Sequence, residues 1–208
     1  MTTLYTMPGT CSLACNIAIA WLDAPVGIKN IAYGDQNSEE YLAINPKGKV
    51  PALRFDDGEV LTELTAIMAW LGAEFGSQGY SRDVRLGYRE AEALSFMTSE
   101  VHAAYGPHFA PQRFASSDAA QEEVKQAAYD TLRSHYERMD SKLADAGGEW
   151  YLGKRSFADA FLYVLTRWLD QTPLDIEDYP ALKRHRERME ADEKVQMALT
   201  RQDMQPIG

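Results

Sequence analysis

The spacing of apolar residues changes about a third of the way along this chain. Up to about residue 75, short strand-like runs alternate with helical stretches, whereas every periodic segment after residue 82 has the spacing of a helix. A sheet covered by helices and a group of helices bury their apolar faces in different ways. We therefore expect a small α/β part followed by an all-α part, with domains at residues 1–78 and 83–208.

The first part predicts a definite order of elements. They are a strand at Thr3–Tyr5, a helix at Ser12–Leu22, a strand at Val26–Ala32, a short helix at Ser38–Ile44, strands at Ala52–Phe55 and Val60–Thr62, and a helix from Glu63. Asp56-Asp57-Gly58 between the last two strands is a strong hairpin signal. The predicted order is βαβαββα, and Gly76-Ser77-Gln78-Gly79 is the expected linker to the helical part.

Composition and charge exclude several classes of partner. The formal net charge is −10 and no basic stripe is present, so we expect neither nucleic acid nor an anionic membrane as a partner. Only two of the 208 residues are cysteines, and no disulfide framework is visible. The start, Met1 to Tyr5, has no basic region and no long apolar run. We expect a cytoplasmic protein.

Cys11 is the best candidate for a reactive atom. It lies where the first strand turns through Met7-Pro8-Gly9-Thr10 into the helix at Ser12. Unpaired N–H groups and the positive end of the helix dipole favour a thiolate there, which predicts an acidic thiol that is readily alkylated. The alternative, a small buried hydrophobic residue, carries equal weight from position alone. Cys15, one helical turn further on, is expected to pack in the core rather than to form a disulfide with Cys11.

Two further motifs place backbone groups at the disposal of a ligand. Pro51 at the start of a strand removes one ladder donor, which leaves main-chain groups of Val50 free for an extended peptide ligand. At Leu61-Thr62-Glu63 a strand runs directly into a helix. The first N–H groups of that helix suit an anion, and the Glu63 carboxylate suits an ammonium group.

A later helix carries small polar residues and a histidine on one face, namely Ser95, Thr98, Ser99 and His102. Such a face suits a helix that lines a cleft, with His102 as a donor to a bound anion or sulfur. A solvated polar face is the alternative. Ser156 and Asp159 form a capping box at another helix start and are expected to be structural. No spacing of His, Cys, Asp or Glu indicates a metal site.

Three segments together resemble one family. Pro8-Gly9-Thr10-Cys11-Ser12-Leu13, Leu42-Ala43-Ile44-Asn45-Pro46-Lys47-Gly48 and Ser99-Glu100-Val101-His102 are similar in order and spacing to cytosolic glutathione S-transferases, most closely the bacterial beta class. The resemblance covers nearly the whole chain. It implies a thioredoxin-like N-terminal domain, an all-α C-terminal domain that binds the electrophile, and a homodimer that serves detoxification.

The resemblance also implies roles for particular residues. It makes Cys11 and His102 the catalytic residues and implies a cis peptide bond before Pro51. The Val50 backbone would pair with the cysteinyl part of glutathione. The γ-glutamyl end would be held by Glu63 and by the backbone at Leu64. Ser99 and Glu100 complete the implied glutathione-binding residues. Glutathione is thus expected as a substrate, with no metal.

The chain departs from this pattern at three places. Leu64 stands where the class usually has Ser or Gly, Ala103 follows His102 where Lys is common, and no Lys or Arg lies between Ala32 and Tyr41. Each departure removes a contact to an anion, so together they predict weaker glutathione binding or a different thiol.

Three functions are compatible with these residues. The first is a glutathione S-transferase that conjugates glutathione to small hydrophobic electrophiles. The second is a glutathione-dependent thiol-disulfide or reductive enzyme in which Cys11 is the nucleophile. The third is a non-catalytic binding protein that has kept the fold and lost the anion contacts.

Overall fold

The computed structural model describes residues 1–76 and 84–207. Contacts divide the chain into two compact units, the first made of Met1–Tyr88 with Met189–Gly208 and the second of Arg89–Arg188. The chain therefore returns to the first unit at its C-terminal end, a feature that the order of predicted elements does not reveal. The predicted linker residues 77–79 lie outside the described residues.

The first unit contains a four-stranded mixed sheet. Its elements are β1 (Thr3–Thr6), α1 (Ser12–Trp21), β2 (Gly27–Asn30), η1 (Asp35–Asn37), α2 (Glu39–Leu42), β3 (Ala52–Arg54), β4 (Val60–Thr62), α3 (Leu64–Phe75) and, from the end of the chain, α9 (Glu193–Thr200). The strand order is β2-β1-β3-β4. β1 pairs with β2 in parallel and with β3 antiparallel, and β3 pairs antiparallel with β4 across the predicted hairpin. This is the predicted βαβαββα arrangement.

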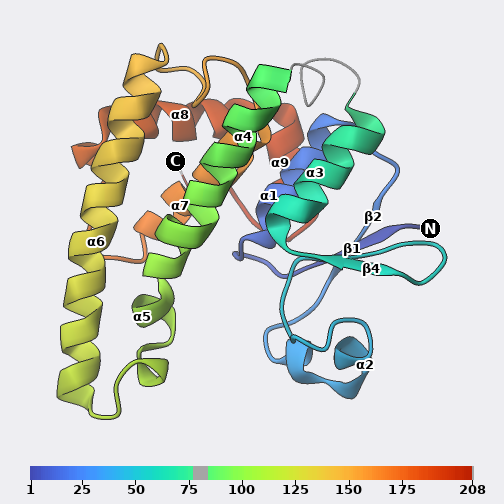
Figure 1. Cartoon of the computed structure of the whole chain (residues 1–208), viewed down its shortest axis with the longest axis horizontal. Coiled ribbons are helices and arrows are strands. Elements are labelled where there is room, and N and C mark those ends of the chain that lie inside the picture. Colours follow the sequence, from blue (N-terminus) through green and yellow to red (C-terminus); the bar gives the residue numbers. More distant parts are fainter. Residues whose placement is uncertain (77–83, 208) are drawn as a thin grey trace. The chain divides into compact units, whose positions relative to one another are not determined.

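Helices cover both faces of this sheet (Figure 1). α1 and α3 lie on one face, and all ten residues of α1 are buried because the helix contacts β1, α3 and α9. A helix that is apolar almost all round needs such surroundings, so its composition correctly predicted burial on more than one side. On the other face, near α2, a second apolar cluster is formed by Tyr5, Met7, Ile31, Tyr41 and Ala52.

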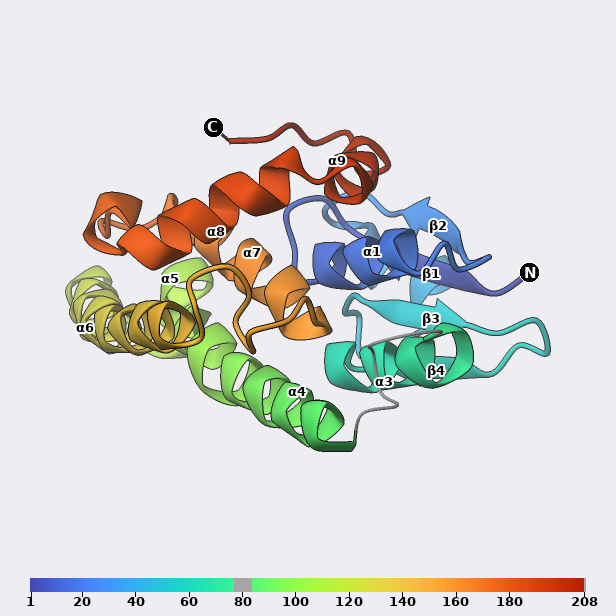
Figure 2. The same cartoon turned by 90° about the horizontal axis from the view of Figure 1, so that it is seen from above.

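The second unit is helical throughout. It holds most of α4 (Val84–Phe96), the segment η2 (Met97–His102), α5 (Gly106–Phe109), η3 (Pro111–Arg113), α6 (Asp118–Asp145), α7 (Phe157–Leu169), η4 (Ile176–Asp178) and most of α8 (Pro180–Ala191). All but one of the residues of α7 are buried, and this helix lies among α4, α5, α6 and α8 (Figure 2). The predicted fold class, a thioredoxin-like α/β part with an all-α part, is confirmed.

One helix differs from its predicted form. We expected regular α-helical spacing through His102, but the segment η2 is a π-helix. The Thr98 hydroxyl donates to the carbonyl of Leu94 at 2.8 Å, and the Ser99 hydroxyl donates to that of Ser95 at 2.8 Å. Hydroxyls that bond to the preceding turn compete with the backbone ladder. Single π-helical turns are often found at functional sites.

Two kinds of feature are absent from the described residues. Within residues 1–76 and 84–207, no helix combines the length and the apolar character needed to cross a membrane. The same residues contain no group of three or more His, Cys, Asp and Glu side chains placed to hold a metal ion.

Candidate active site

Cys11 occupies the N-cap position of α1, as the sequence predicts. The Cys11 side chain makes no cap to this helix, and the N–H of Ser12 donates instead to the Thr10 hydroxyl at 3.4 Å. The Cys11 thiol donates to the carbonyl oxygen of Val50 at 3.7 Å. The turn before it contains Gly9 with a φ of +76°, a left-handed conformation that glycine adopts at little cost. The first unit therefore brings the thiol of Cys11 next to the backbone of Val50.

The expectation of an acidic Cys11 thiol is wrong in this structure. Burial raises the pKa of Cys11 to about 12, and the backbone N–H groups of Cys11 and Ser12 only partly oppose this effect. The side chain is 9% exposed. Sequence reasoning recognised the helix start, which does lower the pKa, but it could not weigh the loss of solvent, which dominates. Cys11 is therefore a thiol at neutral pH.

Cys15 lies in the core, as predicted. Its side chain is fully buried, its sulfur is 4.0 Å from the carbonyl oxygen of Leu64, and both cysteines are free thiols. Burial raises the pKa of Cys15 well above its ordinary value. Nothing about this side chain suggests a role other than packing between α1 and α3.

The Val50–Pro51 peptide bond is cis, in agreement with the family pattern. The carbonyl of the preceding Lys49 accepts hydrogen bonds from the Tyr41 hydroxyl and from the Asn45 amide, both at 2.6 Å. These two bonds fix the loop just before Val50. The N–H of Val50 has no hydrogen-bond partner among the described residues. An extended peptide ligand has a free donor there.

The start of α3 offers further free donors. Glu63 is its N-cap residue with a φ of +72°, and the first backbone bond of the helix runs from the N–H of Ile67 to the carbonyl of Glu63 at 3.0 Å. The N–H groups of the three residues between them are the unpaired donors of a helix start. The Leu64 side chain is only 6% exposed, so it belongs to the core while its N–H stays at the helix end.

The Glu63 carboxylate already has a cationic partner that sequence reasoning missed. The Lys47 ammonium donates to Glu63 Oε1 at 2.7 Å and to the Thr62 hydroxyl at 3.2 Å. The hydrogen bond from Lys47 is the main reason that the pKa of Glu63 is lowered. Lys47 and Glu63 are 16 residues apart, and no local spacing connects them. The sequence predicts that the Glu63 carboxylate is available to the ammonium group of a ligand. In the structure this carboxylate accepts a hydrogen bond from the Lys47 ammonium instead.

The other predicted site residues belong to the second unit. Ser99 and Glu100 are exposed on η2, and His102, at its end, is half-buried. The His102 ring lies 5.0 Å from that of Trp168 and 6.0 Å from that of Phe161, centroid to centroid. Trp168 lies on α7, and no local spacing in the sequence indicates its contact with His102. The roles of Ser99, Glu100 and His102 stay predictions.

Known families match both parts of the chain. Residues 9–74 match the model of the glutathione S-transferase N-terminal domain, and residues 95–193 match that of the C-terminal domain. A protein named glutathione S-transferase GST-4.5 from Xanthomonas campestris is 32% identical over 200 residues, which cover 94% of this chain and 96% of that protein. The chain belongs to the glutathione S-transferase family.

Solved structures agree with this membership. A glutathione transferase homologue from Sulfitobacter, solved with bound glutathione, is 30% identical with a TM-score of 0.88 and covers 98% of this chain and 99% of its own. A bacterial beta class glutathione S-transferase from Sphingomonas chungbukensis is 31% identical with a TM-score of 0.84 and covers 96% and 98%. The resemblance that the three sequence motifs indicated is confirmed.

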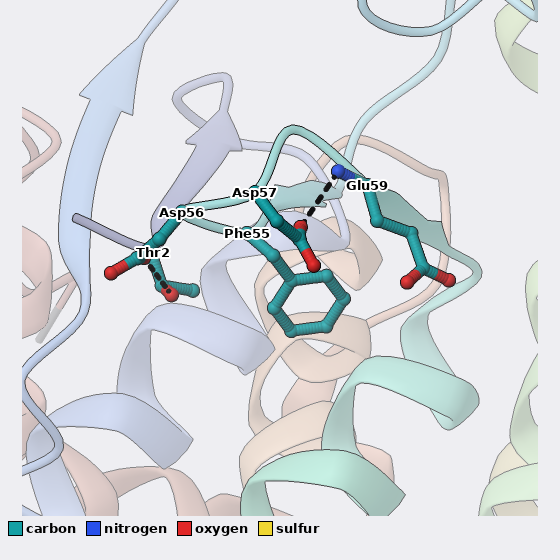
Figure 3. Close-up of a pocket in the computed structure, with 5 residues that line it drawn as sticks. All are labelled: Thr2, Phe55, Asp56, Asp57 and Glu59. Atoms are coloured by element: carbon teal, nitrogen blue, oxygen red, sulfur yellow. Dashed lines mark hydrogen bonds between the residues drawn. The ribbon is translucent and has the colours of Figure 1, made fainter.

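Hollows elsewhere on the first unit do not involve the predicted site residues. One of about 400 Å³ lies at the β3–β4 hairpin and is lined by Thr2, Phe55, Asp56, Asp57 and Glu59 (Figure 3). The carboxylates of this hollow would repel the carboxylates of glutathione. A second, of about 270 Å³, is lined by residues of β1, β2 and the α2 region. Neither of these two hollows is lined by a predicted glutathione-binding residue.

Asp159 is structural, as the sequence predicts. Its carboxylate accepts from the N–H of Ser156 at 2.8 Å, which completes the predicted capping box of α7, and from the N–H of Tyr151 at 2.8 Å. His185 Nε2 lies 3.1 Å from the same carboxylate, and both side chains are fully buried. The sequence did not reveal this histidine partner, because it lies 26 residues away on α8.

Proposed function

We propose that this chain is a glutathione S-transferase that conjugates glutathione to small hydrophobic electrophiles. One observation carries the proposal. Within a single unit, Cys11 at the start of α1, the unpaired Val50 N–H beside the cis Pro51, and the free N–H groups at the start of α3 are all present. Glutathione has a thiol, a peptide backbone and terminal carboxylates, which need these three kinds of group.

Each part of glutathione has a proposed partner. Val50 pairs with the cysteinyl main chain, and the N–H of Leu64 with Glu63 holds the γ-glutamyl end. The contact between Lys47 and Glu63 supports a modified arrangement, in which the Lys47 ammonium neutralises Glu63 and offers a charge to a ligand carboxylate. Ser99, Glu100 and His102 are proposed as site residues on the family pattern.

The raised pKa of Cys11 suggests how the chemistry is divided. At neutral pH Cys11 carries its proton, so its S–H can donate a hydrogen bond to the glutathione sulfur. The positive end of the α1 dipole stabilises negative charge on that sulfur. The glutathione thiolate then attacks the electrophilic carbon, a C–S bond forms, and the leaving group departs with its electron pair. Cys11 remains unmodified in this scheme.

Thiol-disulfide chemistry at Cys11 is the second candidate. A mixed disulfide with glutathione requires the Cys11 thiolate, and a pKa of about 12 leaves little thiolate at pH 7. This observation favours conjugation over exchange. The binding-protein alternative differs from both, because it predicts neither reaction.

The proposal also covers the roles of the two domains, the oligomeric state and the cellular setting. Residues 1–78 form the glutathione-binding domain, and residues 83–208 bind the electrophile and support a homodimer. The family pattern supports the dimer, and the bacterial relatives support a cytoplasmic enzyme that serves detoxification. Analytical ultracentrifugation of the purified chain tests the dimer, which predicts twice the 23.4 kDa chain mass.

Retention on immobilised glutathione, followed by assays of the eluted protein, tests the function. We expect retention, conjugation of 1-chloro-2,4-dinitrobenzene, and conjugation that persists in Cys11→Ala at a reduced rate. Reduction of a glutathione mixed disulfide that disappears in Cys11→Ala, without conjugation in the parent, would favour the second candidate. A protein that neither binds the resin nor catalyses either reaction would contradict the proposal.

A further inference from the structure

We propose that the C-terminal segment Glu193–Met204 positions the loop that carries Cys11, and that Gln202 is the positioning residue. The loop is Met7–Cys11, between β1 and α1. This inference depends on the proposed function only in taking Cys11 as the thiol that meets glutathione. Both the segment and the loop belong to the first unit, although almost 200 residues of sequence separate them.

The segment is firmly attached to α1 and β2. The Asn16 side-chain amide donates to the carbonyl of Ala198 at 3.0 Å, and the Trp21 indole donates at 3.3 Å to Asp192, the N-cap residue just before the segment. The Asn30 amide donates to the carbonyl of Arg201 at 2.7 Å. α9 lies beside α1 (Figure 2). The residues after α9 therefore reach the Cys11 loop from a fixed position.

A buried chain of hydroxyl groups connects Gln202 to the loop. Gln202 Nε2 donates to the Thr6 hydroxyl, and the Thr6 hydroxyl lies 2.5 Å from that of Ser12. The Ser12 hydroxyl lies 2.7 Å from that of Thr10, which donates to the carbonyl of Met7 at 2.8 Å. The side chains of Thr6, Ser12 and Gln202 are fully buried. Thr10 and Ser12 directly flank Cys11 in the amino-acid sequence.

Counting protons gives this chain a direction. A hydroxyl has one proton to donate and two lone pairs to accept with. Since Thr6 accepts from the Gln202 amide, its own proton is available to Ser12, which also accepts from the N–H of Met7 at 3.1 Å. Ser12 then gives its single proton to Thr10, and Thr10 gives its proton to the Met7 carbonyl. With the Gln202 amide as the donor at one end, each hydroxyl of Thr6, Ser12 and Thr10 has at least one donor and one acceptor, and the Met7 carbonyl also lies 3.3 Å from the Ser12 hydroxyl.

Two other features fit the same interpretation. The Met204 sulfur accepts from the N–H of Gly9 at 3.2 Å, a second link from the segment to the loop. Gln202 Oε1 is buried and has no hydrogen-bond partner among the described residues, which destabilises the fold. An apolar side chain would avoid that cost, so packing alone does not explain an amide at this position. The hydrogen bond that the Gln202 amide donates to the Thr6 hydroxyl does explain it.

Alkylation of the two cysteines in the native protein tests the inference without glutathione. Iodoacetamide is added, and the modification of Cys11 and of Cys15 is followed separately by peptide mass mapping. Cys15 is fully buried one turn further along α1, so it reports general opening of the unit. We expect Gln202→Met and Thr6→Val each to change the Cys11 rate at least fivefold, with the Cys15 rate within twofold of the parent.

Matched variants separate positioning from stability. Asn16→Leu removes another buried bond between α1 and the segment but leaves the hydroxyl chain intact, so it should leave the ratio of the two alkylation rates unchanged. Thr6→Ser keeps the hydroxyl and should restore the parent ratio. The double variant Gln202→Met with Thr6→Val should equal the single variants, because both interrupt one chain.

Rates of Cys11 and Cys15 that change by the same factor in Gln202→Met and Thr6→Val would overturn the proposal, as would unchanged rates in both. If Gln202→Met fails to fold, the comparison of Thr6→Val with Thr6→Ser decides alone. Failure to bind immobilised glutathione would contradict the proposed function. It would not affect the conclusion about Gln202, because alkylation by iodoacetamide measures the accessibility of Cys11 without glutathione.

Discussion

The starts of α1 and α7 differ in how their backbone N–H groups are satisfied, although the sequence singles out one residue near each of them, Cys11 at α1 and Asp159 at α7. At α7, Asp159 accepts from the backbone N–H of Ser156, and the carboxylate is fully buried. At α1, Cys11 makes no side-chain cap, and the first turn has no acidic residue. The start of α7, which its own side chains satisfy, is structural. At α1 the N–H groups of Ser12 and Leu13 donate to Thr10, so this start offers a ligand the Cys11 thiol rather than free backbone donors.

The start of α3 differs from those of α1 and α7, because its first N–H groups have no partner among the described residues. Its N-cap residue Glu63 makes no cap to its own helix and is turned instead toward Lys47. Its backbone φ of +72° is unusual for a residue with a side chain. Residues in such conformations cluster at functional sites. The start of α3 thus keeps unpaired donors among the described residues, whereas the second unit closes the start of α7 with a capping box.

Removal of the α7 cap should have the largest effect. Asp159→Ala leaves the N–H groups of Ser156 and Tyr151 and the ring of His185 without their acceptor, and we expect the free energy of unfolding to fall by about 3 to 5 kcal/mol. Urea denaturation measures this loss. The exposed Asp118 at the start of α6 is the control, and Asp118→Ala should cost less than about 1 kcal/mol.

If Asp159 has only a structural role, Asp159→Ala should keep the ability to bind glutathione. Folded Asp159→Ala should bind immobilised glutathione like the parent protein, because its carboxylate contacts only backbone and side-chain groups within the second unit. A variant with parental stability but without glutathione binding would show that a closed helix start can be functional and would break the comparison.

Burial of Cys11 at the start of α1 predicts an unusual pH dependence. With its pKa raised to about 12, Cys11 should react with iodoacetamide about tenfold faster for each pH unit between about pH 7 and 10, without a plateau. Oxidised glutathione should modify Cys11 rather than Cys15. A plateau below about pH 8, or an adduct on Cys15 and none on Cys11, would mean that the helix dipole outweighs burial or that the site is assigned wrongly.

The same pKa predicts a loss of stability in alkali. The folded protein keeps the Cys11 proton to a higher pH than the unfolded chain, whose thiols titrate near about 8.5. The free energy of unfolding should therefore fall as pH rises from about 8.5 toward 12, by at most about 1.4 kcal/mol per pH unit from this group. Cys11→Ala should remove that part of the slope in denaturation curves recorded at several pH values.

The sequence predicted the elements well because their signals are local. The apolar surface of α1, the Asp56-Asp57-Gly58 hairpin and the Ser156–Asp159 capping box each depend on neighbours in the chain, and each is present in the structure. Cys11 and Val50 were found as separate candidates. Their contact at 3.7 Å joins residues 39 apart, and the family pattern rather than the spacing linked them.

What the sequence did not reveal depends on distant partners. Lys47 with Glu63, His185 with Asp159 and Gln202 with Thr6 all join residues from different elements. The sign of the Cys11 pKa shift depends on how much solvent the folded chain removes, which is a property of packing. The return of residues 189–208 to the first unit likewise has no local signal. Long-range contacts therefore separate the predicted site from the observed one.

A substitution at the start of α3 can sharpen the difference between open and closed helix starts. Leu64→Ser should tighten glutathione binding by up to about 1.5 to 3 kcal/mol if the missing hydroxyl limits affinity, because a hydrogen bond to a charged acceptor has that value. Leu64→Ala is the control, since it loses the same buried packing and adds no hydroxyl. Titration calorimetry on both variants isolates the hydroxyl. Equal or weaker binding by Leu64→Ser than by Leu64→Ala would indicate a pocket adapted to another ligand.

The smallest expected effect concerns the ion pair between Lys47 and Glu63. Both residues are more than half exposed, so despite the 2.7 Å contact Lys47→Met should change the free energy of unfolding by less than about 1 kcal/mol. The pKa of Glu63 should rise toward its ordinary range, because the hydrogen bond from Lys47 is what lowers it. The pair stabilises the fold above the pKa of an unfolded glutamate and loses that effect as pH falls through the lower folded value.

An NMR titration of the Glu63 carboxyl in the parent protein and in Lys47→Met measures this change in pKa. Lys29→Met, which breaks the exposed pair with Glu40, is the control and should leave Glu63 unchanged. If Glu63 titrates identically in the parent and Lys47→Met, the carboxylate is not held by Lys47, and the start of α3 is fully open to the ammonium group of a ligand.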